Sequence, residues 1–209
     1  MGIGTHIRRA FGSLEVPVSK AYRGLYIDLD AFARELSSRY KPRTIIEVGC
    51  GDGLFTSCLA RSFPETSILG IDIAQSPGRL FEGNRSQVEF RSEDVTAPLR
   101  RRGFDPVDLV VIIDVIHHVS KAERKAFLAS ARALAAGSGV LVIKEWAPTR
   151  TLAHYLCWFS DRVITGDRVS YATTSDLMRQ LAPMFPDDQI RFEGLVGPRS
   201  NNYFVSIRR

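Results

Sequence analysis

Three glycines spaced by single residues interrupt two apolar stretches of the chain. In the sequence IIEVGCGDGLF, Gly49, Gly51 and Gly53 follow a β-branched run and precede a helix-like segment. A glycine-rich turn between a strand and a helix lets a ligand approach bare backbone at the carboxyl edge of a sheet. Glu47 and Asp52 flank the glycines, and negative charge beside the turn disfavours a pyrophosphate. The pattern therefore predicts a site for a cationic or zwitterionic ligand.

A second group of chemically active side chains follows two further apolar runs. His117 and His118 come shortly after VDLVVIID, and Lys144 and Glu145 lie near the end of GVLVIKEW. Neutral histidine accepts a proton near neutral pH, so His117 is a candidate general base. The other interpretation is that one of the two histidines packs inward and caps the loop, a role that His118 could have. Lys144 and Glu145 point to opposite faces if they lie in a strand, and they either meet the substrate or form a loop salt bridge. All four residues are candidate catalytic groups.

Alternating strands and helices must position these groups. Strands are predicted from short apolar, β-branched runs, and helices from apolar residues at helical spacing. The predicted strands are 44–48, 67–73, 87–92, 107–114, 139–146, 189–197 and 202–209. The predicted helices are 29–40 behind an Asp28 cap, 54–63, a helix that starts at a Ser120–Glu123 capping box and ends at Gly137, 152–164, and 175–181. This alternation predicts an α/β fold with a doubly wound, mainly parallel seven-stranded sheet and an antiparallel edge hairpin.

Composition narrows the class of protein. The chain of 209 residues is 44% hydrophobic and 24% charged, as in soluble globular domains, and its apolar runs fall short of the ~20 residues that cross a bilayer. Three cysteines without CxxC spacing, and an N-terminus without a signal-peptide core, favour a reducing cytoplasm. The net charge of +5 is dispersed, with no alternation of basic and aromatic residues, so nucleic acid is not the expected partner.

Four motifs together resemble those of the class I, Rossmann-like S-adenosylmethionine-dependent methyltransferases. EVGCGDG (47–53) resembles their first motif and GIDIA (70–74) their second, while SEDVT (92–96) and DVIHHV (114–119) resemble the third and fourth. The motifs fall in order on predicted strand ends over residues 43–145. The first motif and the KE pair after the fifth strand are similar to those of small bacterial members of the family.

The resemblance implies S-adenosylmethionine as cofactor, with S-adenosylhomocysteine as product, and implies a role for each matching residue. The glycines lie under the methionine and ribose portions, and Asp72 accepts hydrogen bonds from both ribose hydroxyls. Asp94 and the amide of Val95 contact the adenine edge, and Ile73 packs on its face. The implied cofactor-binding residues are Tyr22, Glu47, Gly49, Gly51, Gly53, Asp72, Ile73, Asp94, Val95 and Asp114.

Several of these residues have a simpler interpretation. A lone carboxylate such as Asp72 or Asp94 is often a turn or helix cap, and Asp114 could cap the loop that follows its strand. An NAD-dependent oxidoreductase is disfavoured by the GxGxG spacing, since dinucleotide-binding proteins use GxGxxG. A cyclase or isomerase that holds the cofactor without methyl transfer, and a non-catalytic binding module, stay as alternatives.

The same resemblance implies a single methyltransferase domain over residues 1–209. Within it we expect an N-terminal helical cover (1–42), a cofactor-binding core (43–146), a substrate-side helical cover (147–186) and closing strands (187–209). Large apolar side chains in both covers predict a small, mainly apolar or aromatic acceptor, natural-product or lipid-like, methylated on oxygen or nitrogen. The expected substrate-binding residues are Tyr26, His154, Trp158 and Tyr171.

The expected partners are few. The paired carboxylates and asparagine of metal-assisted catechol enzymes are not evident, so no metal is expected. The aromatic content of residues 152–164 permits peripheral membrane contact. The protein is expected to act as a monomer or homodimer in the cytoplasm.

Overall fold

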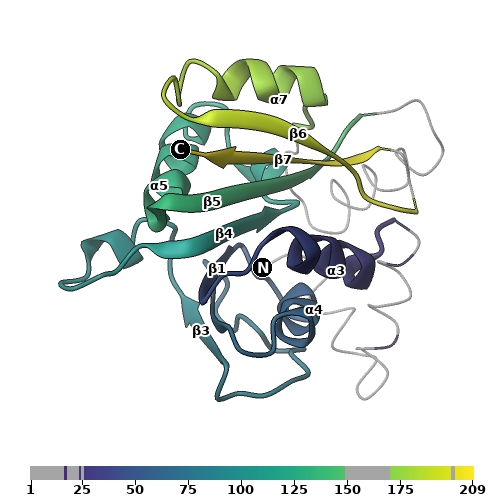
Figure 1. The fold of residues 1–209 in the computed structure, drawn as a ribbon, viewed down its shortest axis with the longest axis vertical. Helices are drawn as coiled ribbons and strands as arrows, with labels where there is room; N and C mark the ends of the chain where they lie inside the picture. Colours follow the sequence, from purple (N-terminus) through teal and green to yellow (C-terminus); the bar gives the residue numbers. More distant parts are fainter. Residues whose placement is uncertain (1–16, 18–23, 25, 149–169, 199–200) are drawn as a thin grey trace.

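The fold is that of a computed structural model, which describes residues 17, 24, 26–148, 170–198 and 201–209. One sheet organises the described residues (Figure 1). Its strand order is β3-β2-β1-β4-β5-β7-β6. The strands are β1 (Thr44–Val48), β2 (Ser67–Asp72), β3 (Val88–Ser92), β4 (Val107–Ile113), β5 (Ala135–Trp146), β6 (Gln189–Leu195) and β7 (Asn202–Arg208).

The sheet is mainly parallel. The strands β1 to β5 pair in parallel, whereas β7 runs antiparallel to both β5 and β6. The chain reverses between β6 and β7, and these two strands close one edge of the sheet (Figure 1). The predicted fold class, a doubly wound seven-stranded sheet with an antiparallel edge hairpin, is confirmed.

Helices cover both faces of the sheet and divide the core in two. One core cluster joins α3 (Leu29–Arg39) and α4 (Leu54–Ser62) to one face, and the other joins α5 (Arg124–Leu134) and α7 (Thr174–Leu181) to the opposite face. A short 3₁₀ helix, η2 (Pro98–Arg100), lies between β3 and β4, and another, η3 (Ile116–His118), lies between β4 and α5. Central strands therefore bury both faces, which is why residues 109–113 of β4 form a continuous apolar run.

Two helix starts follow the predicted capping chemistry. The Asp28 carboxylate accepts a hydrogen bond from the amide of Ala31 at 2.8 Å, and α3 begins at Leu29. The Ser120 hydroxyl donates to the Glu123 carboxylate at 2.6 Å and accepts from the Glu123 amide at 3.3 Å. In this variant of the capping box, regular helix begins only at Arg124.

The predicted helix end at Gly137 is wrong. The helix α5 ends at Leu134, and Ala135 is already extended, with φ −79° and ψ 140°. Ala135 pairs with Val107 of β4, so the chain passes from helix to strand without a glycine cap. Gly137 lies inside β5, which is longer than the predicted strand 139–146.

No helix among the described residues is both long and apolar enough to cross a lipid bilayer.

Candidate active site

The candidate site lies at the carboxyl edge of the parallel strands. The glycine turn follows β1, Asp72 ends β2, Asp114 follows β4, and Glu145 is the penultimate residue of β5. The carboxyl ends of adjacent parallel strands meet at one edge, where open α/β sheets bind their ligands. Long-range pairing in the sheet thus gathers groups that are up to a hundred residues apart in the sequence.

The glycine turn has a backbone conformation that few other residues adopt. The φ angles of Gly49, Gly51 and Gly53 are +76°, +54° and +85°, all in the left-handed region. The turn is fixed to β2, because the amide of Gly49 donates to the carbonyl of Ile71 at 2.8 Å. The amide of Gly51 donates to Oδ2 of Asp72, also at 2.8 Å.

Different neighbours face the three glycines. A Cβ atom added to Gly49 would collide with the side chain of Val115, and one added to Gly53 would lie 2.7 Å from the Cα atom of Gly78. A Cβ atom on Gly51 would meet no atom of the described residues within 4 Å. Packing within the protein therefore accounts for two of the glycines, and Gly51 alone opens onto space that a ligand could use.

Glu47 acts inside the fold as an anchor for α4. It is buried in β1, and its Oε2 accepts a hydrogen bond from the hydroxyl of Thr56 at 2.6 Å. This bond joins the strand before the glycine turn to the helix after it. Glu47 thereby helps to hold the turn in place.

Asp72 and Ile73 form the next part of the edge. The two oxygens of Asp72 accept from the amides of Gly51 and Ala74, each at 2.8 Å. A carboxylate has about four acceptor positions, so both oxygens retain the capacity for a further bond. Ile73 is 83% exposed, so its apolar side chain is accessible to a ligand at this edge.

Asp94 lies in a tight turn after β3. Its Oδ1 accepts from the amide of Thr96 at 2.7 Å and from the hydroxyl of the same residue, and these bonds hold the pKa of Asp94 below its usual value. Arg100 approaches its other oxygen at 3.3 Å. Val95 is buried in the core. Asp94 therefore caps a turn. A ligand that contacts Asp94 would bind it in addition to its hydrogen bonds with Thr96.

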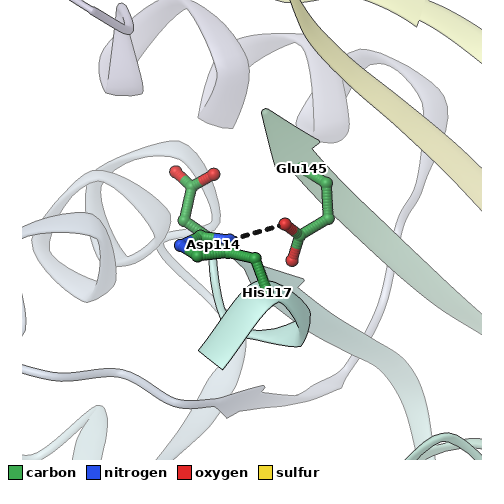
Figure 2. A group of neighbouring side chains, drawn as sticks. All are labelled: Asp114, His117 and Glu145. Atoms are coloured by element: carbon green, nitrogen blue, oxygen red, sulfur yellow. Dashed lines mark hydrogen bonds and ion pairs between the residues drawn. The ribbon is translucent and has the colours of Figure 1, made fainter. Parts of the chain in front are cut away.

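His117 and Glu145 form a buried pair (Figure 2). Nδ1 of His117 lies 2.7 Å from Oε2 of Glu145, and Oε1 of Glu145 accepts from the amide of Ile116 at 2.7 Å. A carboxylate on Nδ1 fixes the tautomer of the neutral ring, which then carries its lone pair on Nε2. The glycine turn is close by, since Val115 packs against Gly49.

Lys144 pairs with Asp114 rather than with its neighbour Glu145. Its ammonium donates to both oxygens of Asp114, at 2.8 and 2.7 Å, and its side chain is 1% exposed. Asp114 has a φ of +52°, unusual for a residue other than glycine, and its amide donates to the carbonyl of Lys144 at 3.0 Å. Side chains alternate along β5, so the adjacent Lys144 and Glu145 serve two separate pairs.

Asp114, His117 and Glu145 lie close enough together to raise the question of a metal ion. One ligand-type atom from each lies within 4.8 Å of the others (Figure 2). The carboxylates are, however, already bonded to donors: Asp114 to the ammonium of Lys144, and Glu145 to His117 and a backbone amide. These groups therefore form two pairs, the Lys144–Asp114 ion pair and the His117–Glu145 pair, rather than a set of free metal ligands.

The expected substrate-binding residues are only partly described. The ring of Tyr171 stacks on His117, with centroids 4.9 Å apart and planes inclined by 28°. Tyr26 packs edge-on against Trp146 at 5.8 Å, and its carbonyl accepts from the side chain of Asn202. His154 and Trp158 lie outside the described residues, as does Tyr22, which was expected to bind the cofactor. His118 is exposed, and its ring centroid lies 4.2 Å from that of His117.

Sequence reasoning missed Arg124, which lies near His117. Arg124 is 5% exposed, and its Nη2 donates to the carbonyls of Val119 and Ser170 at 3.2 and 3.3 Å. The Ser170 amide in turn donates to the carbonyl of His117 at 2.9 Å. Arg124 precedes Leu128 and Ala131 by four and seven residues, so it lies in the apolar stripe of α5. A charged residue in an apolar stripe was the feature of the sequence that could have identified Arg124.

Comparison with known proteins gives a family match and several structural likenesses. The family described as "Methyltransferase domain" matches residues 21–182. Trans-aconitate 2-methyltransferase of Methylobacterium nodulans is 36% identical over 107 residues, covering 48% of this chain and 38% of that protein. This chain therefore spans well under half the length of that curated relative.

Two solved structures illustrate the shared fold. An O-methyltransferase family protein from Burkholderia thailandensis matches with a TM-score of 0.71 and 18% identity, over 98% of this chain and 60% of that one. Magnesium protoporphyrin IX methyltransferase from Synechocystis, solved with bound S-adenosylhomocysteine, matches with a TM-score of 0.61 and 20% identity, over 98% and 99% of the two chains. At these identities the likeness shows the fold.

Proposed function

Because the chain belongs to the methyltransferase-domain family, we propose that it transfers a methyl group from S-adenosylmethionine to an oxygen or nitrogen atom of a small, mainly apolar or aromatic molecule. The observation that carries this proposal is the buried His117–Glu145 pair at the strand edge beside the glycine turn.

The residues at the edge fit this cofactor. No atom of the described residues would lie within 4 Å of a Cβ atom on Gly51. Asp72 keeps acceptor capacity for ribose hydroxyls, and the exposed Ile73 offers an apolar surface for adenine. When bound, S-adenosylmethionine supplies an electrophilic methyl group on a sulfonium. Glu47 and Asp72 place negative charge near the turn, which suits a cationic ligand.

His117 is proposed to act as the general base. Glu145 holds Nδ1, so Nε2 is the atom that accepts the proton of an acceptor hydroxyl or ammonium group. The Glu145 carboxylate then stabilises the imidazolium ion that forms. Methyl transfer is an in-line displacement, so a rigid edge that holds acceptor and donor together supplies much of the rate. The Lys144–Asp114 ion pair joins the ends of β4 and β5 and contributes this rigidity.

The proposed domain organisation places covers on both sides of this edge. Residues 1–42 and 147–186 would close over cofactor and acceptor, and Tyr26 and Tyr171 are the described aromatic groups in these segments. Tyr171 supports this arrangement, because it already packs on His117. Tyr22, His154 and Trp158 keep their proposed roles from the sequence.

Replacing the proposed base tests this function. Acceptors are first found by incubating the protein with S-adenosylmethionine and a panel of small phenols, aromatic amines and aliphatic alcohols, with methylated products identified by mass spectrometry. We expect His117→Asn to lower kcat for such an acceptor by roughly 10²–10⁴-fold, the usual contribution of general base catalysis. Binding of S-adenosylhomocysteine, measured by calorimetry, should stay within a few-fold of wild type.

The matched control is His118→Asn, which changes the exposed neighbour and should leave kcat nearly unchanged. Equal loss in both variants, or normal turnover in His117→Asn, would remove His117 as the base. A protein that binds S-adenosylhomocysteine but methylates no member of the panel would contradict the proposed acceptor class.

A further inference from the structure

A cavity of about 300 Å³ lies beside the His117–Glu145 pair, between the start of α5 and the helix α7. Its described lining residues include three cations, Lys121, Arg124 and Arg179, and one carboxylate, Asp176. Tyr171 also lines this cavity, and the same ring stacks on His117 at 4.9 Å. One aromatic ring therefore separates the cavity from the proposed base.

Arg124 is the unusual member of this lining. Arg124 is only 5% exposed, yet it forms no ion pair with any residue that the structure describes. Nη2 bonds to two carbonyls, and Nε is buried with no hydrogen-bond partner. A buried guanidinium left with an unpaired N–H is costly, because burial removes the water that would otherwise solvate it. An anion in the cavity would offset part of that cost through the attraction of opposite charges.

The carboxylate in the lining does not supply this anion. Asp176 accepts from the hydroxyl of Thr173 at 2.7 Å and pairs with Arg179 at 3.3 Å. The Thr173 bond, with Arg179 assisting, lowers the pKa of Asp176, so that carboxylate is ionised and already paired. The lining thus keeps a net positive charge that Arg124 and Lys121 supply.

We propose that this cavity is an anion subsite, in which Arg124 binds a carboxylate group of the methyl acceptor. A carboxylate suits a guanidinium, because a charge-assisted hydrogen bond adds to the attraction of opposite charges. Tyr171 then packs along the apolar or aromatic body of the acceptor. The inference rests on the proposed function and narrows it: the acceptor is an apolar or aromatic acid.

Fluorine NMR with a simple acid and its amide tests the subsite. The probe is 4-fluorobenzoate, compared with 4-fluorobenzamide at constant ionic strength, in protein saturated with S-adenosylhomocysteine. We expect saturable line broadening and a chemical-shift change with the acid, and neither with the amide. Arg124→Met keeps the volume of the side chain and removes its charge, and it should weaken binding of the acid at least tenfold.

Three further variants serve as a control and as alternatives to Arg124→Met. Lys125→Met removes a charge from an exposed position of α5 that does not line the cavity, and it should bind 4-fluorobenzoate as wild type does. If Arg124→Met does not fold, Lys121→Met and Arg179→Met remove exposed charges from the lining, and each should weaken binding several-fold. Equal binding of acid and amide, or unchanged binding of the acid in the lining variants, would overturn the subsite.

The same samples distinguish failure of the anion subsite from failure of the proposed function. They also test whether the subsite prefers a carboxylate or another anion. Loss of S-adenosylhomocysteine binding by the wild-type protein contradicts the proposed function, whereas intact cofactor binding without binding of 4-fluorobenzoate contradicts the subsite alone. A third probe, 4-fluorophenyl phosphate, distinguishes the anion. Binding of this ester much more tightly than the benzoate, with the same dependence on Arg124, would overturn the assignment to a carboxylate.

Discussion

At the scale of single residues, the pair of Lys144 and Asp114 has two unequally buried members. The lysine side chain is 1% exposed and the aspartate side chain 35%. Removing the aspartate charge leaves a buried ammonium without its counter-ion, whereas removing the lysine leaves a carboxylate that water can reach. The cost of breaking this pair should therefore depend on which partner is removed.

We expect Asp114→Asn to lower the free energy of unfolding by about 3–5 kcal/mol, as for other buried pairs that lose one partner. Asparagine tolerates the positive φ of this position, so the loss reports on charge rather than on backbone strain. Lys144→Met should cost less than Asp114→Asn, and the double variant should recover part of the loss. Urea unfolding measures all three, and an equal or larger loss in Lys144→Met would contradict the argument.

At the scale of elements, the glycine turn combines two constraints that single substitutions can separate. Gly51→Ala adds backbone strain without a clash, so it should cost roughly 1–2 kcal/mol of stability. The added methyl group points into the space proposed for the cofactor, so S-adenosylhomocysteine should bind at least tenfold more weakly. Gly49→Ala and Gly53→Ala also collide with the protein itself and should unfold more easily than Gly51→Ala.

The matched control for the turn is Gly103→Ala. Gly103 has a φ of +75°, and a Cβ atom there would meet no atom of the described residues within 4 Å. This variant carries comparable backbone strain far from the strand edge, in the loop before β4, and should bind S-adenosylhomocysteine normally. If Gly51→Ala also binds normally after the same loss of stability, the turn does not contact the cofactor.

Local sequence patterns predicted the helices and strands better than they predicted the contacts between them. The buried strand β4 could be identified from its apolar run, and α3 from its Asp28 cap, because both signals lie within a few residues. Gly137 was misread as a helix end, since pairing of Ala135 with Val107 is a long-range event that local signals do not carry.

The candidate site shows the same division. His117, Lys144 and Glu145 could be selected by residue type and strand position. Their partners depend on register between β4 and β5, which places Asp114 beside Lys144 and His117 beside Glu145. The unpaired Nε of Arg124 is a feature of packing in three dimensions, visible in the sequence only as a charge in an apolar stripe.

At the scale of the whole molecule, the candidate site lies where the two cores meet at one sheet edge. The glycine turn leads into α4, which packs on one face, and η3 leads toward α5, which packs on the other. Val115, packed on Gly49, connects the two sides. A ligand held between the turn and η3 therefore contacts segments supported by both cores.

This arrangement predicts that cofactor binding stabilises the whole fold rather than one loop. At a ligand concentration of 100 times Kd, S-adenosylhomocysteine should add about 2.7 kcal/mol to the free energy of unfolding. For a domain of this size that corresponds to a rise in Tm of roughly 5–11 °C, in a single cooperative transition seen by calorimetry. NAD at the same concentration should leave Tm unchanged, because the GxGxG turn and its carboxylates do not suit a pyrophosphate. Stabilisation by NAD and none by S-adenosylhomocysteine would contradict the cofactor assignment, and a biphasic transition would contradict the coupling of the two cores through the site.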